Sequence, residues 1–151
     1  MEIRRFVLKD LNQVKVFITD ILKNEFSIDQ KAYPPSDLES IPKVYGGKRE
    51  TFFVGEEDNK IIGTIAVKEE SKKVAILRRL FVSPNYRGKD YGLALIDKAL
   101  DFCRENKYHE VIFHSSARMK AAIGLCLKKG FVEKQRLNLD GVDIIRFALV
   151  L

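Results

Sequence analysis

A short stretch in the middle of the chain, Tyr86 to Gly92 (YRGKDYG), combines two glycines with two cations. It follows an apolar run and a proline and precedes residues with helical spacing, so it lies where a strand turns into a helix. Unpaired backbone amides at a helix N-terminus attract anions, glycines let a ligand approach the backbone, and Arg87 and Lys89 add positive charge. The pattern predicts a phosphate cradle, although a plain strand-to-helix turn with solvated cations explains the same residues.

Asp90 stands inside this stretch, where a carboxylate should repel a bound phosphate. At the opening of the following helix it can instead accept a hydrogen bond from an NH of the next turn, favoured by the macrodipole. We therefore expect its carboxylate to turn back into the helix, and Asp90→Gly to lower thermal stability slightly. The stretch contains neither the GxxxxGK[ST] pattern of a P-loop nor the GxGxxG pattern of a dinucleotide-binding fold.

The elements that position this stretch follow from the period of the apolar residues. We expect, in order, a strand at 3–6, a helix at 11–22, an irregular segment at 24–49 with a short helix from Ser36, strands at 51–56, 60–68 and 73–82, a helix at 92–103, a strand at 110–114, a helix at 118–129 and a hairpin around Asp140-Gly141. One parallel crossover, from strand 74–82 to strand 111–114, places YRGKDYG at the carboxyl end of a central strand, where open α/β sheets bind ligands.

The predicted fold class is therefore α/β, with a mixed, mostly antiparallel sheet, one central parallel strand pair and about four flanking helices. A chain of 151 residues that is 46% apolar suits a single domain over residues 1–151. No stretch approaches the length of a membrane span and the first residues lack signal-peptide order, so we expect a soluble, cytoplasmic protein. The two cysteines, Cys103 and Cys126, fall in separate expected helices without CxxC spacing, and neither a disulfide framework nor a metal site is predicted.

The formal net charge of +6 invites a nucleic-acid interpretation, because clustered cations release counterions from a phosphate backbone. The cations are instead scattered among acids, and the longest basic groups are pairs such as Lys128-Lys129 and Arg78-Arg79. None is interleaved with aromatic residues as in a single-strand binder. A polyanionic small ligand explains the surplus with fewer assumptions, and a basic RNA-associated protein is kept as a third hypothesis.

Two longer stretches, LRRLFVSPNYRGKDYGLALIDKAL and HEVIFHSSARMKAAIGLCLKKGF, together resemble the GNAT superfamily of N-acetyltransferases. In that family a strand ending in a V-x-P turn leads to a [QR]-x-x-G-x-[GA] loop, and a later helix closes on Y-x-K-x-G-F. The first pattern corresponds to Val82-Ser83-Pro84 followed by the loop from Arg87 to Gly92, and the second to the residues from Cys126 to Phe131. The resemblance implies a GNAT-like fold with a splayed central strand pair, and acetyl transfer from acetyl-CoA to a primary amine of a small molecule or peptide by direct attack.

The resemblance also assigns residues to acetyl-CoA. Loop amides would hold the pyrophosphate, and the end of strand 74–82 would pair with the pantetheine arm. A backbone NH near Val82 would polarise the thioester carbonyl. An M-x-x-A pattern would lie on the helix that flanks the other side of the cofactor. The residues so assigned are Leu80, Phe81, Val82, Arg87, Gly88, Lys89, Asp90, Tyr91, Gly92, Met119 and Ala122. A homodimer is compatible with the resemblance.

Three departures from the family pattern concern the chemistry. Asp90 replaces the usual first glycine of the loop, Cys126 replaces a tyrosine that protonates the leaving thiolate in many relatives, and strand 74–82 carries no acid to serve as a base.

Cys126 is a candidate proton donor or a small packing residue. His114, beside the expected splay, is the better placed histidine for a general base or is structural. Water, activated by Glu69 or Glu70, is a further alternative, and a non-catalytic CoA-binding regulatory module is the runner-up function.

Two features bear on the acceptor. Arg78 and Arg79 are expected on opposite faces of their strand, with one toward the acceptor cleft and paired either with the acceptor's carboxylate or, as we favour, with a neighbouring acid. The segment 24–49, with Phe26, Tyr33 and Tyr45, would form the acceptor wall, because irregular segments set substrate choice. These aromatic residues are equally compatible with ordinary core positions.

Overall fold

The computed structural model describes all residues from 1 to 151 and contains one seven-stranded sheet in the order β1-β2-β3-β4-β5-β7-β6. The strands are β1 (Glu2–Arg5), β2 (Thr51–Glu57), β3 (Lys60–Glu69), β4 (Val74–Val82), β5 (Glu110–Ser116), β6 (Val132–Leu139) and β7 (Val142–Val150). The helices are α1 (Leu11–Glu25), α2 (Ile41–Val44), α3 (Tyr91–Glu105) and α4 (Lys120–Lys128), with short 3-10 turns at Leu8–Asp10, Ser27–Ala32, Pro35–Glu39 and Pro84–Tyr86. All strand pairs are antiparallel except β4 with β5, so the predicted fold class is confirmed.

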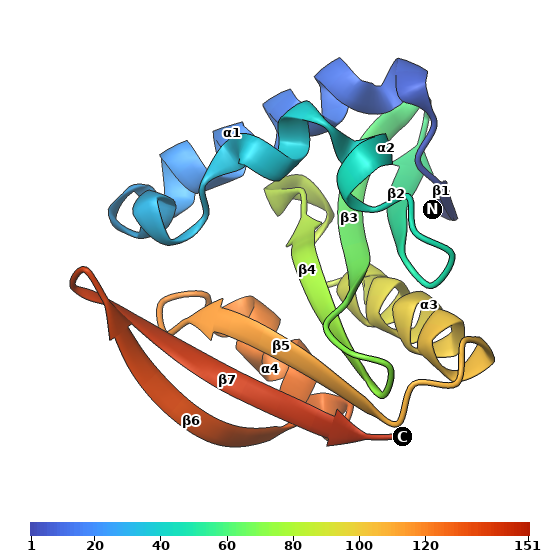
Figure 1. Ribbon diagram of the computed structural model, residues 1–151. Helices are drawn as coiled ribbons and strands as arrows, with labels where there is room; N and C mark the ends of the chain where they lie inside the picture. The colour runs from blue at the N-terminus through green and yellow to red at the C-terminus, as the bar shows by residue number, and fades with distance from the viewer.

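The helices cover the sheet on two sides (Figure 1). Helices α1 and α2 pack on one face of the N-terminal half, in a core that contains Ile18, Phe52 and Phe81. Helices α3 and α4 pack on the other face, in a larger core that contains Leu77, Leu95 and Phe147. None of the helices is long and apolar enough to cross a membrane.

The two central strands diverge, as Figure 1 shows for β4 and β5. They pair only from Val74 opposite Glu110 to Leu77 opposite Phe113, although β4 continues to Val82 and β5 to Ser116. A bulge in β4 lies directly after the last pair, because the register with β3 shifts between Thr64 and Ala66. The edges that face each other beyond Leu77 therefore have no strand partner, which leaves backbone amides and carbonyls available to a ligand.

The bulge is centred on Arg79, whose φ of 56° is unusual for a residue other than glycine. The buried Thr64 hydroxyl donates a hydrogen bond of 2.7 Å to the Arg79 carbonyl, which satisfies the acceptor that the bulge leaves without a ladder partner. The alternation of faces expected along strand 73–82 therefore breaks at this residue, and the prediction that Arg78 and Arg79 point to opposite faces is wrong. Both side chains lie on the side of the sheet that α1 and α2 cover, where Arg79 binds Asp37 and Arg78 lies beside Tyr45.

Candidate active site

A groove of about 220 Å³ opens at the N-terminus of α3, between the end of β4 and the side of α4. We call it the α3 groove. Its lining includes Leu80, Phe81, Val82, Arg87, Gly88, Asp90, Tyr91, Gly92, Met119 and Ala122, together with Phe26, Tyr86, Ala121, Leu125 and Lys128. The fold thus gathers around one groove all the residues that the resemblance assigns to the cofactor except Lys89, whose ammonium lies 5.4 Å from the centre of the Tyr86 ring.

Two glycines shape the groove for different reasons. Gly88 has a φ of 78°, in the left-handed region that glycine adopts without steric cost, and a side chain there would meet nothing within 4 Å. Gly92 is buried, and an added Cβ would lie 2.4 Å from Cδ1 of Leu125. Gly88 therefore serves the backbone turn, whereas Gly92 lets α3 approach α4.

Asp90 does not cap α3 in the way expected from the sequence. It occupies the N-cap position of α3, but its side chain makes no capping hydrogen bond and its backbone is left-handed, with φ 62° and ψ 17°. Glycine adopts this conformation at no steric cost, which accounts for the glycine of the family pattern at this position. The prediction that the carboxylate turns back into the helix is wrong, because the left-handed backbone replaces the extended one that a capping side chain needs.

Side-chain contacts join the loop from Arg87 to Gly92 to neighbouring elements. Arg87 donates from Nε to the Val82 carbonyl at 3.0 Å and from its two terminal nitrogens to the Glu25 carboxylate at the end of α1. The Tyr91 hydroxyl donates to Glu57 at 2.8 Å, and its ring stacks on Tyr86 with the ring centres 6.3 Å apart. These contacts fix the loop to α1, β2 and β4.

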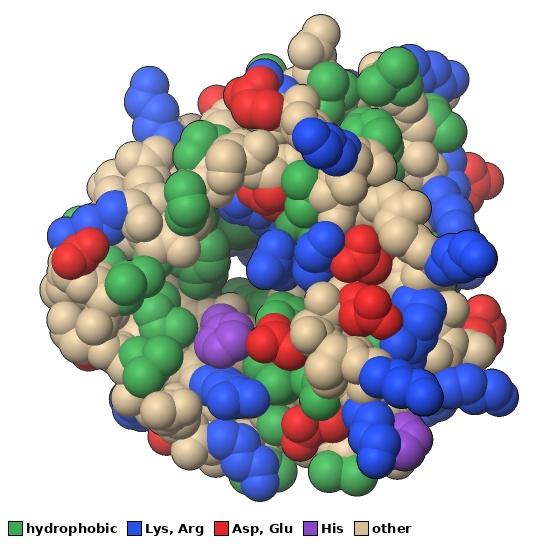
Figure 2. Space-filling model, in the orientation of Figure 1, with side chains coloured by type: hydrophobic (Ala, Val, Ile, Leu, Met, Phe, Trp, Pro, Cys, Tyr) green, Lys and Arg blue, Asp and Glu red, His purple; other side chains and the backbone are tan.

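A second cavity, of about 400 Å³, lies where β4 and β5 diverge; we call it the β4–β5 cavity. Its lining is Ala32, Tyr33, Pro34, Ser36, Asp37, Ile76, Leu77, Arg78, Arg79, Leu80, Phe81, Phe113, His114 and Met119. Figure 2 shows a hollow near the centre of this side of the molecule, bordered by hydrophobic and basic side chains. The cavity shares Leu80, Phe81 and Met119 with the α3 groove, so the two spaces meet at these residues.

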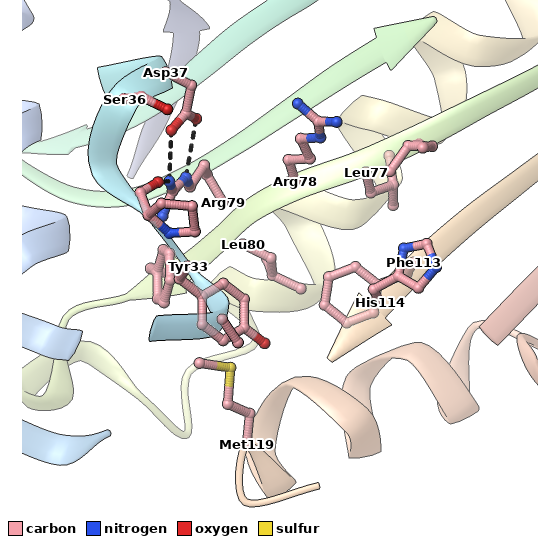
Figure 3. A pocket seen from close by; sticks show the side chains of 14 residues that line it. Tyr33, Ser36, Asp37, Leu77, Arg78, Arg79, Leu80, Phe113, His114 and Met119 are labelled. Carbon is pink, nitrogen blue, oxygen red and sulfur yellow. Dashed lines mark hydrogen bonds and ion pairs between the residues drawn. The ribbon is translucent and has the colours of Figure 1, made fainter. Parts of the chain in front are cut away.

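One wall of this cavity is fixed by an ion pair that is almost buried. Arg79 donates to Asp37 from Nε at 3.0 Å and from Nη2 at 2.5 Å, as Figure 3 shows, and the side chains are only 7% and 14% exposed. Nη2 also donates to the Pro34 carbonyl, and the Tyr45 hydroxyl donates to Asp37 at 2.6 Å. Burial by itself raises the pKa of Asp37, but the hydrogen bonds from Arg79 and Tyr45 outweigh it and hold the pKa below its ordinary value. A neighbouring acid is thus the partner of Arg79, as favoured from the sequence.

The two candidate catalytic residues lie in different environments. His114 lines the β4–β5 cavity with an exposed side chain, and its pKa is lowered by partial burial, by Arg146 and by Arg78, against an opposing effect of Glu70. Cys126 is fully buried in the core between α3, α4 and the sheet and lines neither space. Burial raises the pKa of its thiol to about 12. The structure therefore favours the packing alternative for Cys126.

Tyr33 is a polar group of the cavity whose position the sequence left undecided. Its hydroxyl accepts a hydrogen bond of 2.8 Å from the Ser116 amide at the unpaired end of β5, and the side chain lies between Leu80, Phe113 and Met119 (Figure 3). Burial raises the pKa of the phenol, which therefore keeps its proton. The Tyr33 hydroxyl donates to no protein acceptor, so Tyr33 offers a hydrogen-bond donor to the β4–β5 cavity beside Leu80 and Met119.

Comparison with known families agrees with this geometry. The model of the Acetyltransferase (GNAT) family matches residues 16–131, which include every residue that lines the two spaces and leave out β1 and the final hairpin. The chain belongs to the GNAT acetyltransferase family. The match also contains the segment 24–49 that separates α1 from β2 and carries the Arg79 partner Asp37.

Individual GNAT proteins resemble the chain in different degrees. N-acetyltransferase 8F1 of Rattus norvegicus is 33% identical over 101 residues, which are 64% of this chain and 46% of that protein. The chain therefore spans less than half the length of this relative. An acetyltransferase of the GNAT family from Staphylococcus aureus Mu50 superposes with a TM-score of 0.88 at 25% identity, covering 99% of this chain and 98% of that one. The protein yncA from Salmonella typhimurium, solved with its cofactor acetyl-CoA, shares the fold with a TM-score of 0.79 at 17% identity over 99% and 92% of the two chains.

Proposed function

We propose that this GNAT protein transfers an acetyl group from acetyl-CoA to a primary amine of a small molecule or peptide. The observation that carries the proposal is the meeting of two spaces at Leu80, Phe81 and Met119. One space is a groove at a helix N-terminus, which suits a phosphate-bearing cofactor, and the other is a cavity at the splay of two strands with charged and hydrogen-bonding side chains in its wall. A thioester at the junction would face this cavity, so that an amine bound there can reach it.

The α3 groove has the parts that acetyl-CoA requires. The loop from Arg87 to Gly92 and the first turn of α3 offer backbone amides and the positive end of the helix dipole to a pyrophosphate. The unpaired edge of β4 at Leu80, Phe81 and Val82 offers main-chain groups to the amides of the pantetheine arm, as in strand addition. The structurally similar protein yncA was solved with its cofactor acetyl-CoA, which supports the same cofactor here.

The transfer follows from this placement as a direct attack. The nitrogen of a neutral amine attacks the thioester carbonyl, the C–N bond forms as the C–S bond breaks, and the amine loses one proton while the CoA thiolate gains one. We assign His114 as the base that receives the amine proton, because its lowered pKa keeps the imidazole neutral near pH 7. We assign the donor role to Tyr33 instead of Cys126, because the phenol lines the β4–β5 cavity beside Leu80 and Met119 whereas the thiol is enclosed in the core.

A non-catalytic acyl-CoA-binding module is the second candidate function. The observation that favours it is the buried Cys126 at the position where many relatives carry the acidic tyrosine. Calorimetry with acetyl-CoA, followed by CoA thiol release with a panel of amines, distinguishes the two. Binding with amine-dependent release is the result expected of an enzyme, binding without release supports the module, and no binding contradicts both. Cytoplasmic location and a homodimer stay predictions.

A further inference from the structure

Three basic residues lie in one row across the sheet, on the face that α1 and α2 cover elsewhere. His114 on β5 pairs directly with Arg146 on β7. On the other side, the parallel register of β4 with β5 ends at Leu77 opposite Phe113, and Arg78 is the next residue of β4. Paired residues of adjacent strands project from the same face, so Arg146 lies beside His114 on that face. Arg78 lies across the start of the splay from His114 and lines the β4–β5 cavity with it, so a ligand at this end of the cavity lies between the two arginines.

These two arginines lack the acidic partners that three neighbouring cations have. Lys68 pairs with Glu50 at 3.0 Å, Arg49 pairs with Glu69 at 2.5 Å, and Arg79 pairs with Asp37 at 2.5 Å. Neither Arg78 nor Arg146 forms an ion pair, although Arg146 is half-buried and its buried Nε has no hydrogen-bond partner. A guanidinium that is partly withdrawn from water without an acidic partner is costly, and it is typical of a site for an anion.

The remaining charges leave this end of the cavity positive. Asp37 is the acidic side chain that lines the β4–β5 cavity, and its charge is taken by Arg79. Glu70, which acts on the His114 imidazole from the end of β3, is exposed and pairs with neither arginine. Two uncompensated guanidinium groups beside His114 therefore repel a simple polyamine and attract a molecule that brings its own negative charge.

We propose that the acceptor is an amine that also carries a carboxylate, which Arg78 and Arg146 bind on either side of His114. This inference rests on the proposed acetyl transfer and names the acceptor class of the same cavity. The carboxylate would lie at the His114 end, and the amine would point toward Leu80 and Met119, where the cavity meets the α3 groove. Free amino acids and peptides with an acidic residue near the amino terminus are amines of this kind. Arg78 and Arg146 act as specificity-determining residues, with His114 between them placed to receive the proton of an amine that the carboxylate anchors.

The test compares matched acceptors that differ only in the carboxylate. CoA thiol release is measured with phenylalanine against phenylalaninamide and leucine against leucinamide, with spermidine as a cationic contrast. The wild type is expected to favour the acid of each pair, and Arg78→Gln and Arg146→Gln each to reduce this preference about tenfold or more, mainly through KM, because a hydrogen-bonded charge contact is lost. Comparing the same pair in two proteins cancels the difference in amine pKa. Calorimetric affinity for acetyl-CoA is expected to stay unchanged in both variants.

Arg136→Gln is the matched control, because it removes the same charge from an exposed pair with Glu133 on β6. A preference for amides or spermidine, or an equal change of preference in Arg136→Gln, contradicts the proposal. A second readout does not need turnover: with CoA saturating, N-acetylphenylalanine is expected to bind the wild type at least tenfold more tightly than its amide. Equal binding of these two probes overturns the acceptor class, whereas failure to bind acetyl-CoA contradicts the proposed function itself.

Discussion

The α3 groove and the β4–β5 cavity meet at three residues but are built in opposite ways. The groove is formed by a continuous stretch from Leu80 to Gly92 and by one side of α4, and its chemistry lies mainly in backbone amides. The cavity is formed by side chains from the segment before α2, from β4 and from the end of β5, and its chemistry lies in those side chains. One space depends on local backbone shape, and the other on long-range contacts.

The difference predicts where each space is vulnerable. A groove made of backbone is sensitive to bulk and to backbone conformation, and tolerant of changes in the loop's outward side chains. A cavity made of side chains from distant segments is sensitive to the loss of single charges, because each buried charge depends on one partner. Substitutions in the two spaces should therefore affect different measurements.

The largest effect is expected at the ion pair that fixes the cavity wall. Arg79→Ala leaves the Asp37 carboxylate largely buried without its partner and should lower the free energy of unfolding by about 3 kcal/mol. Urea denaturation measures the change. Arg87→Gln is the control, because its pair with Glu25 is more exposed, at 34% and 28%, and should cost less than about 1 kcal/mol. Similar losses in the two variants would contradict the distinction between the spaces.

Removing the imidazole should affect catalysis without affecting the groove. His114→Gln is expected to lower kcat/KM by about a hundredfold, because a positioned general base contributes at least that much. Only the neutral imidazole accepts a proton, and burial, Arg146 and Arg78 lower its pKa below the ordinary 6.5 against the effect of Glu70. Wild-type kcat/KM should therefore rise with pH through that lowered pKa, and the variant should lack this rise. An unchanged profile would assign the proton to water.

The two candidates for thiolate protonation can be separated by small substitutions. Tyr33→Phe removes the phenol and should lower kcat by about tenfold, which is modest because CoA is a tolerable leaving group. Cys126→Ala should leave kcat near the wild-type value, since the thiol lines neither space. Thiol release under saturating acetyl-CoA measures both. A large loss of kcat in Cys126→Ala, with stability retained, would reverse the assignment.

Bulk at the helix junction should affect the groove alone. Gly92→Val places atoms where Leu125 lies, and because Leu125 also lines the groove, its displacement narrows the cofactor space. We expect acetyl-CoA affinity to fall about tenfold, with a loss of stability of about 1–2 kcal/mol from overpacking. Gly124→Ala is the control in the neighbouring helix, where an added Cβ meets nothing within 4 Å and helix propensity should improve. Calorimetry with acetyl-CoA checks the pair.

The smallest effect is expected at Asp90. Because its φ of 62° suits glycine, Asp90→Gly should leave stability unchanged or raise it by up to about 1 kcal/mol, the reverse of what the sequence suggested. Removing the carboxylate should leave acetyl-CoA affinity equal or tighter. Thermal unfolding and calorimetry measure both quantities. A clear loss of stability would mean that the carboxylate supports the helix despite the missing capping bond.

The groove was largely predictable because its residues are adjacent in the sequence. The strand, the V-x-P turn and the loop from Arg87 to Gly92 are local, and their composition indicates both the backbone shape and the ligand. The conformation of Asp90 was not predictable, because an aspartate suits both an extended cap and a left-handed turn.

The cavity was less predictable because it depends on one bulge. Alternation along 73–82 indicates a regular strand, and nothing local marks Arg79 as the residue with positive φ. The bulge brings Arg78 and Arg79 to one cavity, and it is followed by the divergence of β4 from β5. The contact of Tyr33 with the Ser116 amide joins residues 83 positions apart, and no sequence spacing indicates such a contact.

The most direct test of the proposed acetyl transfer follows acetyl-CoA and an amine in one reaction. The protein is mixed with acetyl-CoA and the panel of acid and amide acceptors, and CoA thiol and acetylated amine are measured together. We predict one thiol for each N-acetylated amine, at a rate that depends on His114. Tight acetyl-CoA binding without any acetylated amine across the panel would contradict the account and favour a binding module.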